Sequence, residues 1–256
     1  MLTTTAAPVS ATRAADPRVP ARPALSARTA LLASLTSFGL VILIGLAMTG
    51  GTPGPGGLDA SSAGFREWAV SHTWTQQPLL WVEWAFDKHT LQYWMLALAA
   101  LLLLRRQVRE ALLTVAVMWT TLELTGWAKA LFGRDRPQWQ APDHFHASGS
   151  FPSAHASGTA ALMGLVLVFV VLRSRNAAVR LWGTVVVTAT VLAVCLDRLF
   201  LGRHYPSDLA AGVLLGGGMV LVAMAFVSVQ ARERGTTLAR VAPLQDRERV
   251  LVSRSA

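Results

Sequence analysis

The sequence DRLFLGRHYPSD, residues 197–208, joins two long apolar runs, residues 181–200 and 209–229. A simple connection would need only a few turn residues, but this stretch carries arginines, a histidine and two carboxylates. Asp208 follows His204 by four residues, so the carboxylate can reach back to the imidazole if the next helix begins at the intervening proline. A histidine held by a carboxylate beside guanidinium groups suits a nucleophile or base that acts on an anionic substrate. The alternative is a salt-bridged polar loop at a membrane surface.

The composition indicates an integral membrane protein. Of the 256 residues, 53% are hydrophobic and only 14% are charged, whereas soluble domains carry about 25% charged residues. The single cysteine, Cys195, lies in an apolar run, which excludes a disulfide within the chain and argues against a thiolate zinc site. The net charge of +9 does not indicate a nucleic-acid partner, because most arginines flank the apolar runs.

The chain divides into a membrane domain between two polar tails. Residues 1–28 lack an apolar period and predict a disordered cytoplasmic tail, and residues 230–256 predict a charged cytoplasmic tail. Between them, residues 29–229 predict an all-α bundle of six transmembrane helices. The six apolar runs are residues 29–48, 91–104, 111–128, 156–172, 181–200 and 209–229.

A tryptophan-rich segment follows the first run after a glycine- and proline-rich break, Gly50–Gly57. Residues 61–88 hold four tryptophans near predicted helix ends, which is typical of helices that lie on a membrane surface. Simple anchoring explains these tryptophans, and gating of a substrate is the alternative.

Three residues inside the runs also carry expectations. Gly212 and Gly216 have the spacing that lets helices approach closely, which we expect within the chain and not in a dimer. Glu123 lies inside the third run, and we expect its carboxyl group to be protonated or paired within the bundle.

The arginines predict how the chain is oriented in the membrane. With both termini and the 105–110 and 173–180 connections on the cytoplasmic side, 16 of the 23 basic residues lie inside. Five of the other seven belong to the polar connections 129–155 and 197–208, which this orientation places outside. We therefore expect a multi-pass protein of a bacterial inner membrane, with both termini cytoplasmic and these two connections extracytoplasmic.

The first of the two outward connections carries positive charge at the membrane boundary. Lys129 ends the third run, and Arg136 and Pro137 follow after six intervening residues. Lysine and arginine at a membrane boundary usually extend their charge into water. Here they lie on the side where positive charge is disfavoured, and a bound phosphate would explain them, since arginine offers a two-pronged donor and lysine a point charge.

The same connection ends in FPSAH, residues 151–155, directly before the fourth run. A proline near a helix start fits the fixed proline angle, and the free amides of a first turn favour an anion. Ser153 can add a hydroxyl donor, and His155 lies within the first turn. The alternatives are that Ser153 only caps the helix and that His155 is an interfacial histidine.

The order Lys-x6-Arg-Pro, Pro-Ser-x-His and Arg-x5-His-x3-Asp resembles the motifs of the type 2 phosphatidic acid phosphatase superfamily. This superfamily also includes members that act on polyprenyl diphosphates and phosphatidylglycerol phosphate. The matching residues are Lys129, Arg136, Pro137, Pro152, Ser153, His155, Arg198, His204 and Asp208. Two positions depart from the family pattern. Ala154 stands where glycine is usual, which fits a helical first turn unless a positive φ is required. Asp197 stands where serine is usual, and we expect it to pair with Arg198 or Arg203.

The resemblance implies a role for each matching residue. His204 would attack phosphorus and form a phosphohistidine, Asp208 would orient its ring, and His155 would protonate the leaving oxygen and then activate water. The groups that would bind the phosphoryl oxygens are Lys129, Arg136, Ser153, Ala154 and Arg198. No metal or other cofactor is implied, because three cations already neutralise the phosphate. The pair His144 and His146 has no evident third ligand, so we expect no metal there either.

The substrate that the resemblance implies is a lipid phosphate or diphosphate, whose tail would enter from the surrounding membrane lipids. Hydrolysis is the expected reaction. Transfer of the phosphoryl group to an alcohol is an alternative that the sequence does not separate from it. A third possibility is a non-enzymatic lipid-binding or transport protein, and the sequence leaves the oligomeric state open.

Overall fold

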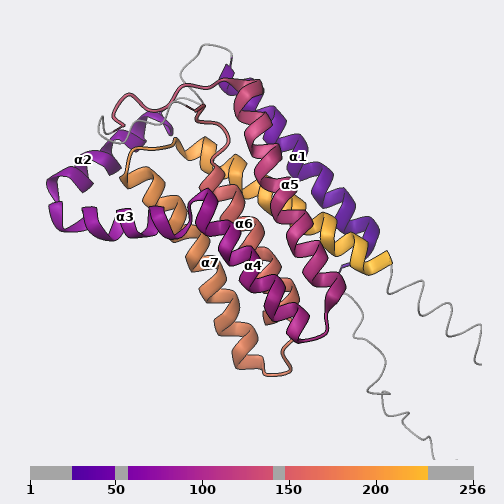
Figure 1. Ribbon diagram of the computed structural model, residues 1–256. Helices are drawn as coiled ribbons and strands as arrows, with labels where there is room; N and C mark the ends of the chain where they lie inside the picture. Colours follow the sequence, from indigo (N-terminus) through magenta and orange to yellow (C-terminus); the bar gives the residue numbers. More distant parts are fainter. Residues whose placement is uncertain (1–24, 50–56, 141–147, 230–256) are drawn as a thin grey trace, which may run out of the picture.

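The computed structural model describes residues 25–49, 57–140 and 148–229. Within these ranges the chain is helical and contains no strand, and the long helices form a bundle (Figure 1). Several expectations concern residues outside these ranges: the tails 1–24 and 230–256, the break at 50–56, and the pair His144 and His146.

Five helices of the described chain are long and apolar enough to cross a membrane. They are α1 (Ala27–Thr49), α5 (Val108–Phe132), α6 (Ala154–Val166) with its π-helical continuation Leu167–Val171, α7 (Ala177–Phe200) and the last helix (Pro206–Val229). A further apolar helix, α4 (Lys88–Leu104), has 17 residues. That length corresponds to about 26 Å, against a hydrocarbon core of about 30 Å. The six predicted spans thus correspond to five full-length helices and one shorter helix.

The tryptophan-rich segment forms two short helices. They are α2 (Ala63–Ser71) and α3 (Gln76–Ala85), preceded by single 3-10 turns at Ala60–Ser62 and Thr73–Thr75. Both helices project sideways from one end of the bundle (Figure 1). Trp74, Trp81 and Trp84 are each more than 60% exposed. Exposed indoles at the end of an apolar bundle suit the boundary between a bilayer and water.

The helix ends that carry the three motifs meet at this same end of the bundle. Here α5 ends at Phe132 and is capped by Gly133, whose φ of +55° is left-handed and whose N–H donates to the carbonyl of Lys129. The start of α6 is capped by Ser153, whose Oγ accepts the N–H of Ala156. The N–H of Ser153 also donates to the carbonyl of Asp208 at 3.1 Å, which joins α6 to the last helix.

The opposite end of the bundle holds both ends of the described chain. The hydroxyl of Ser228 donates to the carbonyl of Leu25 at 3.1 Å. At this end Arg173 also forms a 2.9 Å ion pair with Glu110 at the start of α5. Because the chain starts and finishes at one end, it traverses the bundle an even number of times.

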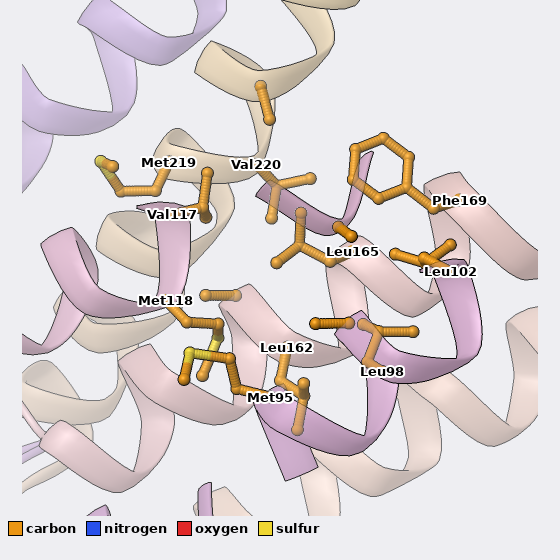
Figure 2. Packing of buried hydrophobic residues seen from close by; sticks show 14 of the residues in the cluster. Met95, Leu98, Leu102, Val117, Met118, Leu162, Leu165, Phe169, Met219 and Val220 are labelled. Atoms are coloured by element: carbon orange, nitrogen blue, oxygen red, sulfur yellow. The ribbon is translucent and has the colours of Figure 1, made fainter. Parts of the chain in front are cut away.

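The core lies where α4, α5, α6 and the last helix meet. Figure 2 shows leucine, methionine and phenylalanine side chains from these helices converging, among them Leu98, Leu162, Leu165 and Phe169, all buried. In a bilayer such packing competes with lipid and not with water, so close fit matters more than burial itself.

Two glycines bring the last helix against α6, as their spacing predicted. A Cβ added at Gly212 would lie 2.8 Å from the carbonyl oxygen of Ser153 and 2.8 Å from Cβ of Ala156. A Cβ at Gly216 would collide with the main chain of Ser157. Only hydrogen fits at either position, so the two helices touch main chain to main chain.

Glu123 does not lie within the bundle, which corrects that expectation. The residue is exposed on α5, between the exposed residues Trp119 and Trp127 at helical spacing. Its position within the apolar run predicts how deep it lies along the helix, but not that the helix turns its side chain outward.

Candidate active site

His204 and Asp208 lie together at the motif end of the bundle, both buried. Nδ1 of His204 is 3.4 Å from Oδ2 of Asp208. The last helix begins at Pro206, so Asp208 stands in its first turn, and the N–H of Tyr205 donates to the same oxygen at 2.9 Å. The hydroxyl of Ser150 also donates to Oδ2 of Asp208, and Ser150 Oγ lies 3.5 Å from Nδ1 of His204. The structure thus holds the imidazole against an ionised, well-bonded carboxylate.

The ring of His204 is neutral near pH 7. Burial lowers its pKa to about 3, and the charges of Lys129 and Arg136 act in the same direction, against the bond to Asp208. A neutral imidazole carries one N–H and one lone pair. Because Nδ1 faces a carboxylate, the proton belongs on Nδ1 and the lone pair on Nε2. That is the protonation state a nucleophile or base requires.

The two cations of the first motif hold neighbouring main chain. Nζ of Lys129 donates to the carbonyls of Gly149 at 2.5 Å and Ser150 at 3.3 Å. The guanidinium of Arg136 donates to the carbonyl of Arg203 at 3.0 Å. Burial lowers the pKa of Arg136 to about 10, with repulsion from Arg203 contributing. It is therefore still a cation at neutral pH, within the electrostatic reach of His204.

The guanidinium of Arg198 is surrounded by acceptors. Nε donates to Oδ2 of Asp197 at 2.8 Å, and Nη2 donates to the same oxygen. Nη1 donates to Oε1 of Glu83 at 2.9 Å and lies 3.3 Å from Nε2 of His155. Nε of Arg203 is 3.3 Å from the same oxygen of Glu83. The expected pairing of Asp197 is therefore with Arg198, and α3 adds a second carboxylate that was not expected.

The second motif forms the entry to α6. Ser153 is fully buried and serves as the helix cap, with its hydroxyl hydrogen still available for donation. Ala154 is the first residue of α6 and adopts the ordinary right-handed helical conformation, so no glycine is needed there. His155 follows in the first turn, with Nε2 3.3 Å from the carbonyl oxygen of Glu83. The structure brings all three motifs to one cluster.

Sequence reasoning missed four polar residues of this cluster: Asp59, Glu83, Arg134 and Ser150. Arg134 stands inside the first motif but was counted only as a basic residue of the connection. Ser150 lies next to the second motif. Glu83 and Asp59 come from the segment around α2 and α3, whose tryptophans had suggested only membrane anchoring. The one sequence signal for Glu83 was a carboxylate placed among tryptophans that favour the membrane interface.

The cluster has the parts that phosphoryl transfer needs. A neutral, carboxylate-oriented histidine, His204, lies within the electrostatic reach of Lys129 and Arg136, and a second histidine, His155, lies beside Arg198. Fixed cations stabilise the charge on a transferring phosphoryl group, which is the dominant contribution in such reactions. The fold and the clustered motifs together are those expected of a helical membrane enzyme that acts on an anionic substrate.

Comparisons with known proteins agree with this class. The family model described as the PAP2 superfamily matches residues 110–232, which include all three motifs. Two relatives, from strains CDC 1551 and H37Rv of Mycobacterium tuberculosis, are both named decaprenylphosphoryl-5-phosphoribose phosphatase. Each is 33% identical over 141 residues, which cover 51% of this chain and 69% of the relative. The crystal structure of a transmembrane PAP2-type phosphatidylglycerolphosphate phosphatase from Bacillus subtilis superposes with a TM-score of 0.64 at 18% identity, over 77% of this chain and 96% of that one.

The chain belongs to the PAP2 superfamily. It is a hydrolase of the phosphatase class and a multi-pass membrane protein. The likeness to the Bacillus structure shows that the fold is shared. The non-enzymatic alternative left open by the sequence is therefore set aside.

Proposed function

We propose that this protein hydrolyses a lipid phosphate or diphosphate through a phosphohistidine formed on His204. The observation that carries the proposal is the neutral, buried imidazole of His204 with Nδ1 directed at Asp208, set among the cations of the motifs. Nε2 is then the atom with a free lone pair. The family and the phosphatases it resembles support the same reaction class.

In the first half of the reaction, Nε2 of His204 attacks phosphorus in line, and the bond from phosphorus to the leaving oxygen breaks. The ring acquires positive charge as the N–P bond forms, and Asp208 stabilises that imidazolium through Nδ1–H. His155 protonates the leaving oxygen. Proton transfer of this kind contributes about 10²–10⁴-fold.

In the second half, His155 takes a proton from water, and the resulting hydroxide attacks the phosphohistidine. The N–P bond breaks, its electron pair returns to Nε2 of His204, and inorganic phosphate leaves. Acid and base are the same residue because its protonation state after the first half is the one needed for the second.

The phosphoryl oxygens would bind Lys129, Arg136 and Arg198, with the hydroxyl of Ser153 and the amide of Ala154 at the start of α6. In the structure, Nη1 of Arg198 donates to Glu83. A phosphate that binds Nη1 of this guanidinium would therefore compete with the carboxylate of Glu83. No metal or other cofactor enters this proposal.

The substrate class follows from position and from the relatives. The site lies at the end of an apolar bundle beside helices with exposed tryptophans, so a lipid tail can remain in the bilayer while its phosphate reaches the cluster. The Mycobacterium relatives are named for a polyprenyl-linked sugar phosphate, and the Bacillus protein for a glycerolipid phosphate. We propose a polyprenyl-linked phosphate or diphosphate as the first substrate to test.

We also propose that α4 is a sixth span and that residues 29–229 form the catalytic membrane domain. The even number of passages through the bundle supports six spans, because both ends of the described chain lie opposite the site. The excess of arginines at the termini and in the 105–110 and 173–180 connections supports a cytoplasmic location for that end. The tails 1–28 and 230–256 would then be cytoplasmic, and the site would face outward from a bacterial inner membrane.

The first experiment measures phosphate release by the purified full chain in mixed micelles. The panel contains phosphatidic acid, phosphatidylglycerol phosphate, a polyprenyl diphosphate and a soluble phosphomonoester. We expect release from at least one lipid and a loss of at least about 10³-fold in His204→Ala, the scale seen when a nucleophile is removed. The matched control is His89→Ala, which removes an exposed histidine at the start of α4 and should keep full activity.

Equal release by wild type and His204→Ala would overturn the mechanism. Adding an alcohol such as glycerol to the same assay separates hydrolysis from transfer. Label found on the alcohol instead of in free phosphate would make the protein a phosphotransferase.

A further inference from the structure

Arg134 lies outside the residues that match the family motifs, yet it is bound by carboxylates on both sides. Nη2 is 2.6 Å from Oδ2 of Asp59, and Nη1 is 2.6 Å from Oδ1 of Asp208. The side chains of all three residues are at most 9% exposed. Burial opposes the charge, but Asp208 and Asp59 hold the pKa of Arg134 above its ordinary value. A guanidinium that bridges two carboxylates is a fixed cation with a fixed direction.

Ser207 closes this arrangement into a cycle of hydrogen bonds. Its N–H donates to Oδ1 of Asp59 at 3.1 Å, and its hydroxyl donates to Oδ2 of Asp59 at 2.6 Å. Nη1 of Arg134 in turn donates to Ser207 Oγ at 2.7 Å. Asp59 precedes the first 3-10 turn, far from these residues in sequence, and so it is fastened to the residue directly before Asp208.

This cycle of hydrogen bonds determines which oxygen of Asp208 faces His204. Arg134 occupies Oδ1, while Ser150, Tyr205 and His204 all contact Oδ2. With Oδ1 held, the carboxyl group cannot rotate without losing a buried, charge-assisted bond. Oδ2 is therefore kept toward Nδ1 of the imidazole.

Asp59 also affects how much negative charge Asp208 presents to His204. An arginine alone on Asp208 would draw negative charge away from the side that must stabilise an imidazolium. Because Asp59 shares the guanidinium, Asp208 keeps more of its charge for His204. Asp59 and Arg134 thus affect the transition state, in which the imidazole of His204 is positive, more than the ground state, in which it is neutral.

We propose that Asp59 and Arg134 form a positioning pair, which orients Asp208 and preserves its charge so that His204 can act as nucleophile. Neither residue need touch the substrate. The inference rests on the proposed phosphohistidine mechanism, and it adds a carboxylate from the connection between α1 and α2 to the residues on which turnover depends.

The test compares Asp59→Asn with wild type in the full chain, on the panel lipid that wild type hydrolyses fastest. The amide keeps the size and an acceptor oxygen but removes the charge. We expect kcat to fall about 10–100-fold, the range for outer-shell partners, while KM changes less than about threefold. The rate of phosphoenzyme formation is measured with a labelled substrate and rapid quenching, and it should fall by the same factor as kcat.

The matched control is Asp87→Asn, at another acidic position of the same end. Asp87 caps α4 by accepting from the N–H groups of His89 and Thr90, a task that asparagine also performs. We expect this variant to keep wild-type kcat and KM. It separates the charge at Asp59 from a general effect of losing a carboxylate on this face.

Two outcomes would overturn the pairing: wild-type kcat in Asp59→Asn, or a rise in KM with kcat unchanged. If Asp59→Asn does not fold, Ser207→Ala is the second variant, since it removes the Ser207 hydroxyl from the hydrogen-bond cycle and keeps the charges of Asp59 and Arg134. It should lower kcat about threefold or more. Wild-type kcat there would equally contradict the proposal. Failure of the mechanism itself is distinguishable, because His204→Ala would then retain activity.

Discussion

The buried, neutral ring of His204 makes the folded protein sensitive to acid. An unfolded chain protonates histidine with a pKa of about 6.5, whereas the pKa of His204 in the fold is about 3. Between these values the unfolded state binds a proton that the folded state does not. The free energy of unfolding therefore falls as the pH drops below about 6.5, by about 2 kcal/mol at pH 5.

We accordingly expect the melting temperature of the wild type to fall between pH 7 and pH 5 by about 4–8 °C more than that of His204→Asn. Asparagine fills part of the same space and does not titrate. The measurement is a tryptophan-fluorescence melt of the detergent-solubilised protein at each pH. Identical pH dependence in the two proteins would mean that the ring is already protonated in the fold.

Among single residues, the sequence predicted what local spacing controls. His204 and Asp208 are four residues apart across a helix start, so their contact follows from helix geometry. Glu83 meets Arg198 across 115 positions, and Asp59 meets Ser207 across 148. No local pattern encodes such contacts, because they depend on how α2 and α3 return to the bundle.

At the scale of an element, α3 supplies a negative charge to the proposed phosphate site. Glu83 Oε1 accepts from Arg198 and lies 3.3 Å from Nε of Arg203, while the tryptophans of the same helix are exposed. In the proposed mechanism, the carboxylate takes N–H donors that phosphate oxygens would otherwise bind. We therefore expect substrate and product both to compete with it.

Removing this competitor should strengthen binding of free phosphate. We expect Glu83→Gln to lower the inhibition constant of inorganic phosphate by about three- to tenfold, since a partly buried ion pair is worth about 1 kcal/mol. The control is Glu67→Gln, which neutralises an exposed carboxylate on the neighbouring α2. A weaker inhibition in Glu83→Gln would show instead that Glu83 positions Arg198 for phosphate.

The helices themselves were predictable from apolar runs, and their ends less so. The run 91–104 corresponds to α4, which begins three residues earlier because Asp87 caps it. The run 111–128 extends in both directions to Val108 and Phe132, where a glycine in the left-handed region stops α5. Hydropathy marks the part of a helix that lipid surrounds, whereas caps and turns decide where it ends.

At the scale of the whole molecule, the orientation in the membrane can be tested with the single cysteine removed. In a Cys195→Ser background, we introduce Glu67→Cys on α2 or Ala177→Cys at the start of α7, both at exposed positions at opposite ends of the bundle. A membrane-impermeant maleimide on intact spheroplasts should label Glu67→Cys, and Ala177→Cys only after lysis. Retained phosphatase activity verifies that each variant is folded.

The reverse labelling pattern would place the site on the cytoplasmic side and contradict the arginine count. Labelling of both positions from one side would contradict an odd number of passages between them. Either result would leave the chemistry of the site intact, because the cluster forms whichever way the bundle is inserted.

The main-chain contact between α6 and the last helix fixes the spacing between the two proposed catalytic histidines. The N–H of Ser153 donates to the carbonyl of Asp208, and Gly212 lets the backbones touch just below. At Gly212 the last helix meets the main chain of Ser153 and Ser157 and the small side chain of Ala156. We therefore expect substitutions among the leucines, valines and methionines elsewhere in the bundle to leave the distance from the proposed acid to the proposed nucleophile unchanged. A protein built this way can diverge widely in its lipid-facing and core sequence and still conserve its reaction.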